Sequence, residues 1–175
     1  MTEELKNRIS KIKMLVLDVD GILTDGTLIV NADGTETKNF NSLDGHGIRL
    51  MKRAGCKVAF LSGRFSDPTT VRAAQLEVDY CFQDKHFKLP VLNELAQTEN
   101  ITLENIAYMG DDLPDLPIIR AVGFAATVPN AAPEVKLHAH FITEKTGGNG
   151  AVREVIELIL KINGKWDSIM KRYLE

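Results

Sequence analysis

The chain lacks the features that are typical of disulfide-rich, membrane-spanning or secreted proteins. Its 175 residues contain only two cysteines, Cys56 and Cys81. Two are too few for a disulfide framework, and we expect both to be free, buried, small apolar residues. No apolar run approaches the ~20 residues of a membrane helix. The N-terminus carries acidic residues where a signal peptide would be basic and then apolar. We therefore expect a cytoplasmic protein that does not bind membranes.

The chain also lacks a large excess of either charge. Lys and Arg number 21 against 24 Asp and Glu, and no basic stripe is present. We therefore expect no nucleic-acid partner. The apolar share of 44% is typical of a globular protein, and 175 residues are enough for one domain with a good core. We predict a single domain over residues 1–175.

The most informative stretch is an apolar run, residues 14–17, that ends in Asp18 and Asp20. A short apolar run bounded by turn residues predicts a strand buried on both faces of a parallel sheet. Asp18 then lies at the carboxyl end of the strand, where open α/β sheets bind ligands. Residues i and i+2 of an extended chain point to the same side, so both carboxylates can face one site. Two carboxylates this close repel each other, so we expect a cation or a shared proton between them, and Mg²⁺ suits such oxygen ligands.

Strand and helix patterns alternate along the rest of the chain, which predicts an α/β fold with a doubly wound parallel sheet. The expected strands are 14–17, 57–61, 79–82, 105–109, 123–127 and 139–142, and the expected helices are 3–10, 48–54, 67–77, 87–98, 115–121, 133–136 and 151–162. Asp33-Gly34 predicts a β-hairpin over 26–41 that projects from the edge of the site. Residues 44–47 are expected to form a turn, Asp67 to cap its helix, and 163–175 to form a polar tail.

Three further expected strands deliver polar residues to the same edge of the sheet. Ser62 ends the second expected strand, Lys88 follows the third, and Asp111 and Asp112 follow the fourth. Together with Asp18 they suit phosphoryl transfer, in which one Asp attacks phosphorus and forms an aspartyl-phosphate. Mg²⁺, a lysine and hydroxyl or backbone donors would neutralise charge on the transferring oxygens. A second acid would protonate the leaving oxygen and then activate water.

This combination resembles the haloacid dehalogenase-like phosphatase superfamily, which implies that fold. The segments Asp18–Gly26, Asp44–Ile48, Ser62–Arg64, Tyr108–Asp112 and Gly147–Glu154 are, more narrowly, similar to the 3-deoxy-D-manno-octulosonate 8-phosphate (KDO 8-phosphate) phosphatase family. The resemblance implies a Mg²⁺-dependent phosphoric monoester hydrolase of lipopolysaccharide sugar biosynthesis. It also implies a homotetramer assembled through the hairpins and a domain without a large cap.

The resemblance implies a role for each matching position. Asp18 would be the nucleophile and a metal ligand, Asp20 the acid/base that also gives its carbonyl to the metal, and Asp111 the third ligand. Phosphate would be bound by Ser62, Gly63 and Lys88. The sugar acid would be bound by Asp20, Asn41, Asp44, Gly45, Arg49, Arg64 and Arg72. Supporting roles would go to Thr24, Asp112, Asp115 and Arg153, the last helping the tail to close a site, which can be a neighbouring subunit's.

One departure from the family pattern keeps a second substrate open. The family has Arg where this chain has Leu43, so one cationic contact to an acidic sugar is missing. A 9-phosphate of a nonulosonic acid is the alternative substrate. A phosphoacceptor receiver domain also uses Mg²⁺, Asp, a hydroxyl and Lys on a doubly wound sheet. Such domains place the acceptor Asp after a middle strand, whereas nothing acidic ends the strand 57–61 here.

Overall fold

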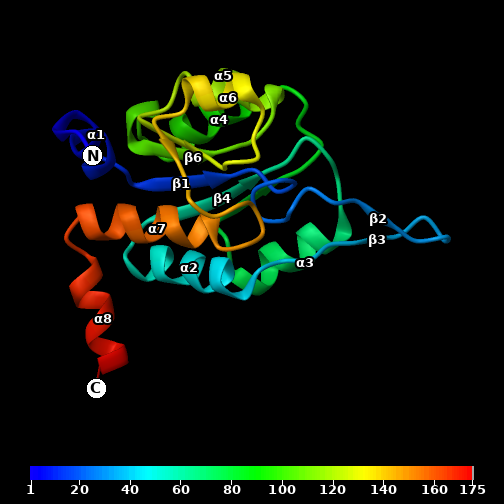
Figure 1. Cartoon of the computed structure of the whole chain (residues 1–175), viewed down its shortest axis with the longest axis horizontal. Coiled ribbons are helices and arrows are strands. Elements are labelled where there is room, and N and C mark those ends of the chain that lie inside the picture. Colours follow the sequence, from blue (N-terminus) through cyan, green and yellow to red (C-terminus); the bar gives the residue numbers. More distant parts are fainter. Residues whose placement is uncertain (175) are drawn as a thin grey trace.

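A six-stranded, all-parallel sheet forms the centre of the molecule, as a computed structural model of residues 1–174 describes it (Figure 1). The strands are β1 (Met14–Leu17), β4 (Lys57–Leu61), β5 (Tyr80–Phe82), β6 (Ile106–Met109), β7 (Phe124–Thr127) and β8 (Phe141–Ile142). Their order is β5–β4–β1–β6–β7–β8. The predicted doubly wound parallel sheet is confirmed, since the chain first builds outward from β1 to β5 and then returns to β6.

Strand β1 holds the middle of this sheet. All four of its residues are buried, and it pairs with β4 on one side and β6 on the other. Leu17 lies opposite Phe60 and Met109, so the residue after it emerges between two strand ends. The strand order reverses between β1 and β6, which is the point where open α/β sheets bind ligands.

Helices cover both faces of the sheet (Figure 1). The longer ones are α1 (Glu3–Ser10), α2 (Ser42–Arg53), α3 (Asp67–Leu76), α4 (Lys88–Thr98), α7 (Ala151–Ile162) and α8 (Trp166–Leu174), and the shorter ones are η1 (Leu103–Asn105), η2 (Leu113–Asp115), α5 (Leu116–Ile119) and α6 (Pro133–His138). In Figure 1, α4, α5 and α6 lie on one side of the sheet and α2 and α7 on the other. None of the helices in residues 1–174 combines the length and apolarity that crossing a bilayer requires.

Helix α2 corrects the prediction for residues 44–47. The helix begins at Ser42, and Asn41 caps it by accepting a hydrogen bond from the Leu43 amide. Gly45 and Gly47, which suggested a turn, lie inside this helix. Glycine is found at both positions because neighbouring residues pack closely against them. A β-carbon on Gly45 would lie 2.3 Å from the Arg72 guanidinium. A glycine in a helix interior therefore signals close packing here and not a break.

Three smaller expectations need correction or completion. Ser66, and not Asp67, stands in the N-cap position of α3. The tail, predicted to be polar with Trp166, Ile169 and Tyr173 on one face, forms a helix, α8; Glu175 lies outside the described residues. Both cysteines are free, but Cys81 is exposed while Cys56 is buried, so the expected burial is wrong for Cys81.

The predicted hairpin is confirmed as β2 (Ile29–Val30) and β3 (Glu36–Thr37). It extends away from the sheet, at the right of Figure 1. Leu28 and Val30 on it are 51% and 65% exposed. A two-stranded hairpin is marginal alone, so an exposed apolar face on it favours packing against another surface.

A glycine-rich loop before α7 lies directly against the turn that follows β1. A β-carbon on Gly147 would lie 1.8 Å from the Gly21 carbonyl oxygen, and one on Gly148 2.7 Å from the Asp25 amide nitrogen. No side chain fits in that contact. The loop therefore supports the turn that carries Asp20.

Candidate active site

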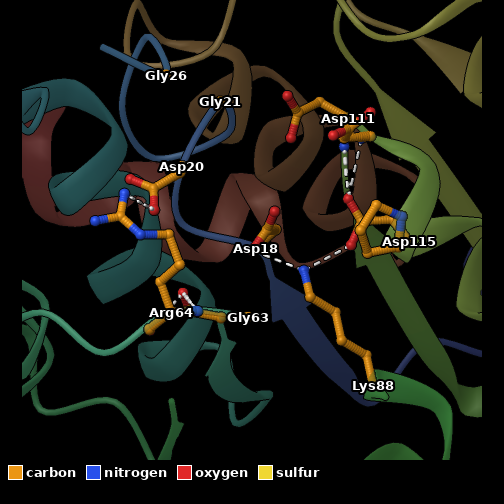
Figure 2. A pocket seen from close by; sticks show the side chains of 12 residues that line it. Asp18, Asp20, Gly21, Gly26, Gly63, Arg64, Lys88, Asp111 and Asp115 are labelled. Atoms are coloured by element: carbon orange, nitrogen blue, oxygen red, sulfur yellow. Dashed lines mark hydrogen bonds and ion pairs between the residues drawn. The ribbon is translucent and has the colours of Figure 1, made fainter. Parts of the chain in front are cut away.

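A cavity of about 290 Å³ opens at the carboxyl ends of β1, β4 and β6 (Figure 2). It is lined by Asp18, Asp20, Gly21, Gly26, Ser62, Gly63, Arg64, Lys88, Asp111, Asp112, Pro114 and Asp115. The residues predicted for catalysis, metal binding and phosphate binding therefore come together in one cavity. Together with neighbouring side chains, they form two clusters that differ in burial and in the elements that carry them.

The inner cluster consists of Asp18, Lys88, Tyr108 and Asp115. The Lys88 ammonium lies between two carboxylates, 2.9 Å from Asp18 Oδ1 and 2.7 Å from Asp115 Oδ1 (Figure 2). The Lys88 side chain is only 3% exposed. Desolvation alone lowers the pKa of this lysine, but the two carboxylates and their hydrogen bonds outweigh it and the net pKa is raised. Lys88 therefore stays a cation at the edge of the cavity.

Asp115 is occupied on both oxygens. Its Oδ1 accepts hydrogen bonds from Lys88 and from the Tyr108 hydroxyl at 2.5 Å, and its Oδ2 accepts from the amides of Asp111 and Asp112. A carboxylate with four donors is well satisfied. Asp115 therefore positions Lys88 and the turn after β6.

Asp18 and Asp111 form the part of the site that suits a metal ion. Burial first, and then the Asp115 charge, raise the pKa of Asp18 to about 8. Burial and the charges of Asp115 and Asp112 raise the pKa of Asp111 to about 7. Buried carboxylates with raised pKa values need a cation to stay ionised.

The donor set fits a hard divalent cation. Oxygens of Asp18, Asp111 and Asp115 lie within 4.8 Å of one another, and Asp111 Oδ1 is buried without a hydrogen-bond partner in residues 1–174. Because Asp115 is already occupied, Asp18 and Asp111 are the side chains left to bind it. Gly21 leaves the space, since a β-carbon there would lie 2.1 Å from Asp111 Oδ2.

The outer cluster consists of Asp20, Glu36, Lys38 and Arg64. Lys38 contacts Asp20 Oδ1, and its Nζ lies 3.9 Å from Glu36 Oε2. Arg64 contacts Glu36 Oε1 and lies 3.9 Å from Asp20 Oδ2; Figure 2 shows it beside Asp20. The four charges of this cluster alternate in sign, and two of its members, Asp20 and Arg64, line the cavity.

Glu36 and Lys38 were missed by the sequence reasoning, although a signal was present. They stand two apart at the end of the predicted hairpin, so they point to the same side of an extended chain. That spacing shows that they share a side, but it does not show that this side faces the site.

The phosphate-binding prediction concerns the turn after β4. Ser62 is 3% exposed, and its hydroxyl donates to the Arg64 carbonyl and accepts from the Arg64 amide, at 2.9 and 3.2 Å. This bonding shapes the turn and leaves Gly63 on the cavity wall. Across the cavity, Thr24 accepts hydrogen bonds from the amides of Gly21 and Gly26, which fits its expected supporting role.

Five predicted substrate residues, and the predicted supporting residue Arg153, lie outside the cavity of the single chain. Asn41, Asp44, Gly45, Arg49, Arg72 and Arg153 are absent from its wall. Asp44 is 1% exposed and accepts hydrogen bonds from the amides of Gly150 and Arg153, which satisfies donors at the start of α7. Arg49 donates to the Gln75 carbonyl. A role for these residues in binding substrate stays a prediction.

The fold and this acidic site together define a haloacid dehalogenase-like hydrolase, and the family model with that description matches residues 81–156. The KdsC 3-deoxy-D-manno-octulosonate 8-phosphate phosphatase of Escherichia coli (strain K12) is 40% identical over 89% of this chain and 83% of its own. The chain belongs to that phosphatase family.

Solved structures of related phosphatases agree in fold. The Moraxella catarrhalis 3-deoxy-D-manno-octulosonate 8-phosphate phosphatase, in complex with magnesium, phosphate and KDO, has a TM-score of 0.96 at 42% identity, covering 99% of both chains. A cobalt-bound enzyme of the same kind from Haemophilus influenzae has a TM-score of 0.87 at 38% identity, covering 90% of this chain and 92% of its own.

Proposed function

We propose that the protein is a Mg²⁺-dependent phosphatase that hydrolyses KDO 8-phosphate to KDO and inorganic phosphate. The observation that carries the proposal is the buried Asp18–Lys88 pair at the sheet edge, beside the unpartnered Asp111 oxygen. The choice of KDO 8-phosphate as the substrate rests on membership of the phosphatase family. The reaction serves lipopolysaccharide sugar synthesis in the family, and we extend that role to this chain.

In the first step, an Asp18 carboxylate oxygen attacks phosphorus and forms an aspartyl-phosphate while the bond from phosphorus to the sugar oxygen breaks. Asp20 gives a proton to that leaving oxygen. In the second step, Asp20 takes a proton from water as the water oxygen attacks the same phosphorus. Phosphate leaves, and the Asp18 carboxylate is restored.

The rest of the site stabilises charge during both steps. Lys88 holds a fixed positive charge 2.9 Å from Asp18 Oδ1, next to the reacting oxygen. The Gly63 amide is proposed to donate to a phosphate oxygen. The Ser62 hydroxyl would donate to another by turning away from the Arg64 carbonyl, which accepts its hydrogen bond in this structure. A Mg²⁺ ion held by Asp18, Asp111 and the Asp20 carbonyl would supply further charge neutralisation on those oxygens.

We also propose an oligomeric state, a domain organisation and a cellular compartment for the enzyme. The exposed Leu28 and Val30 on the hairpin support a homotetramer held together by hairpins. Residues 1–175 would act as one domain without a large cap. The free, exposed Cys81 suits a reducing compartment, and we propose the cytoplasm. Light scattering on the purified protein tests the tetramer, and a monomer would contradict it.

Phosphate release with Mg²⁺ tests the function. The substrates are KDO 8-phosphate, N-acetylneuraminate 9-phosphate and a simple sugar phosphate, with Asp18→Asn as the blank and Asp33→Asn, at the exposed hairpin tip, as the matched control. We expect a strong preference for KDO 8-phosphate that disappears in Asp18→Asn and persists in Asp33→Asn. Preference for the 9-phosphate would keep the mechanism and overturn the substrate. Release that survives Asp18→Asn would overturn the mechanism.

A further inference from the structure

Lys38 is a buried cation in the outer cluster that the mechanism above does not use. It follows β3 of the hairpin, and its side chain is only 2% exposed. It contacts Asp20 Oδ1, and Glu36 Oε2 lies 3.9 Å away. Lysine is almost never this buried unless it is paired, and here its direct partner is the proposed acid/base.

Stability alone is a weak reason for such a pair. Desolvation of two charges offsets most of their attraction, so an apolar pair of similar size is often as stable. Lys38 also contacts a side chain, Asp20, that lines the cavity. Its location beside Asp20 favours a role in the reaction.

The two oxygens of Asp20 stand in different surroundings. Lys38 occupies Oδ1. Within residues 1–174, Oδ2 has no hydrogen-bond partner, and Arg64 NH1 lies 3.9 Å from it. A protonated carboxyl has one oxygen that carries the proton and one that accepts hydrogen bonds. Because the Lys38 ammonium can only donate, Oδ1 is the acceptor and Oδ2 is the oxygen left to carry the proton.

We propose that Lys38 is a positioning residue for Asp20. By donating to Oδ1 it fixes the carboxyl rotamer and leaves Oδ2 to give its proton to the leaving oxygen in the first step and to take one from water in the second. Lys38 itself transfers no proton. The hairpin thereby takes part in the active site of its own chain, through a side chain 18 positions along the sequence from Asp20. This inference rests on the proposed role of Asp20.

The test uses two substrates that differ in their need for an acid. A sugar alkoxide leaves poorly without a proton, whereas p-nitrophenolate leaves without one. The value of kcat/KM reports the steps up to release of the leaving group. In Lys38→Met, which keeps the length of the side chain without its charge, we expect kcat/KM for KDO 8-phosphate to fall at least tenfold more than for p-nitrophenyl phosphate. Lys38→Arg, which keeps a donor, should recover part of that selective loss.

Controls separate positioning from damage to the hairpin. Asn31→Ala removes the side-chain hydrogen bonds to Thr35 and Thr37 at the hairpin tip and should leave the ratio of the two kcat/KM values unchanged. Inhibition by inorganic phosphate should be unchanged in Lys38→Met, because Lys38 is bonded to Asp20 and not to the proposed phosphate-binding residues Ser62, Gly63 and Lys88. If Lys38→Met does not fold, Lys38→Leu, which also lacks a donor, gives the same comparison.

Equal losses on both substrates, or no loss on either, would overturn the role of Lys38. The wild-type enzyme reports separately on the proposed function. If it hydrolyses p-nitrophenyl phosphate but not KDO 8-phosphate, the substrate is wrong, and the Lys38 comparison is then made with whichever sugar phosphate is cleaved.

Discussion

The inner and outer clusters face the same cavity but are built in opposite ways. The inner side chains Asp18, Lys88 and Asp115 are 11%, 3% and 1% exposed and stand at the ends of core elements. The outer side chains range from 2% exposed at Lys38 to 42% at Arg64, and they are carried by turns and by the hairpin. The inner group is therefore fixed by the fold. The outer group can vary between enzymes with different substrates without disturbing the sheet.

The two clusters also differ in how fully their polar atoms are hydrogen-bonded. Asp115 has a donor at every position, but Glu36 Oε2 and Arg64 NH1 are buried without hydrogen-bond partners in residues 1–174. Buried polar atoms without partners are costly, and a bound polyhydroxy acid can satisfy both an acceptor and a donor. The inner cluster suits chemistry common to phosphate esters, and the outer cluster suits recognition of the leaving group.

The largest expected effect comes from removing the inner cation. Lys88→Met should lower kcat about 10²- to 10³-fold, the usual loss when a donor to developing charge is removed. Lys85→Met, which removes an exposed lysine three positions earlier, is the matched control and should stay within twofold of wild type. Steady-state phosphate release measures both. Similar activity in the two variants would show that the inner cluster does not carry the chemistry.

Asp115→Ala tests whether the inner cluster also holds the fold. The change removes four hydrogen bonds and one of the two carboxylates that neutralise Lys88. We expect the free energy of unfolding to fall by roughly 3 kcal/mol in urea denaturation. Asp33→Ala at the exposed hairpin tip should change it by less than about 0.5 kcal/mol. A small loss in Asp115→Ala would contradict the view that this carboxylate is structural.

Magnesium should act where the two clusters meet. At 100 times its dissociation constant, a ligand of the folded state adds about 2.7 kcal/mol of stability. For a chain of this length that raises Tm by roughly 5–10 °C. Asp111→Asn should lose most of that shift, whereas Asp112→Asn should keep it. A shift that persists in Asp111→Asn would show that the ion is bound elsewhere.

Glu36→Gln tests the outer cluster by itself. The change removes the negative charge that holds Arg64, so Arg64 becomes free to meet the substrate carboxylate. We expect KM for KDO 8-phosphate to fall about threefold to tenfold, which corresponds to roughly 1 kcal/mol, with kcat within twofold. KM for p-nitrophenyl phosphate, which lacks a carboxylate, should change less. A fall in kcat on both substrates would instead place Glu36 in the chemistry.

The smallest effect is expected outside both clusters, at Asp44. Asp44→Ala removes the acceptor for two amides at the start of α7 and should cost about 1 kcal/mol of stability without changing KM. Asp44→Asn keeps an acceptor and should be milder. A tenfold rise in KM at unchanged stability would restore Asp44 as a substrate contact.

Residues that directly follow strands were the ones that could be predicted from sequence. The apolar runs before Asp18, Ser62 and Asp111 mark buried strands, and parallel strand ends must meet at one edge of the sheet. Lys88 lies six positions after the end of β5, and its role was expected from the family resemblance, whereas its contact with Asp115 was not predicted. Long-range contacts such as Asp44 to α7 leave no periodic signal, because each depends on how two helices pack.

The direction of the hairpin and the role of the helical glycines could not be predicted from the sequence. Asp33-Gly34 identified the turn, but the direction of the hairpin relative to the sheet is set by packing, so Lys38 was missed. Gly45 was interpreted as part of a turn because close helix packing and chain reversal both select for a missing side chain.

The contact between Gly147 and the Gly21 carbonyl has a consequence for biosynthesis. More than one hundred residues separate the two glycines, and at about 5–20 residues per second a ribosome needs roughly 6–25 s to make them. The nucleophile is therefore made long before the loop that supports its turn. A nascent chain that already contains every proposed catalytic residue would still be inactive until the glycine-rich segment had emerged and docked.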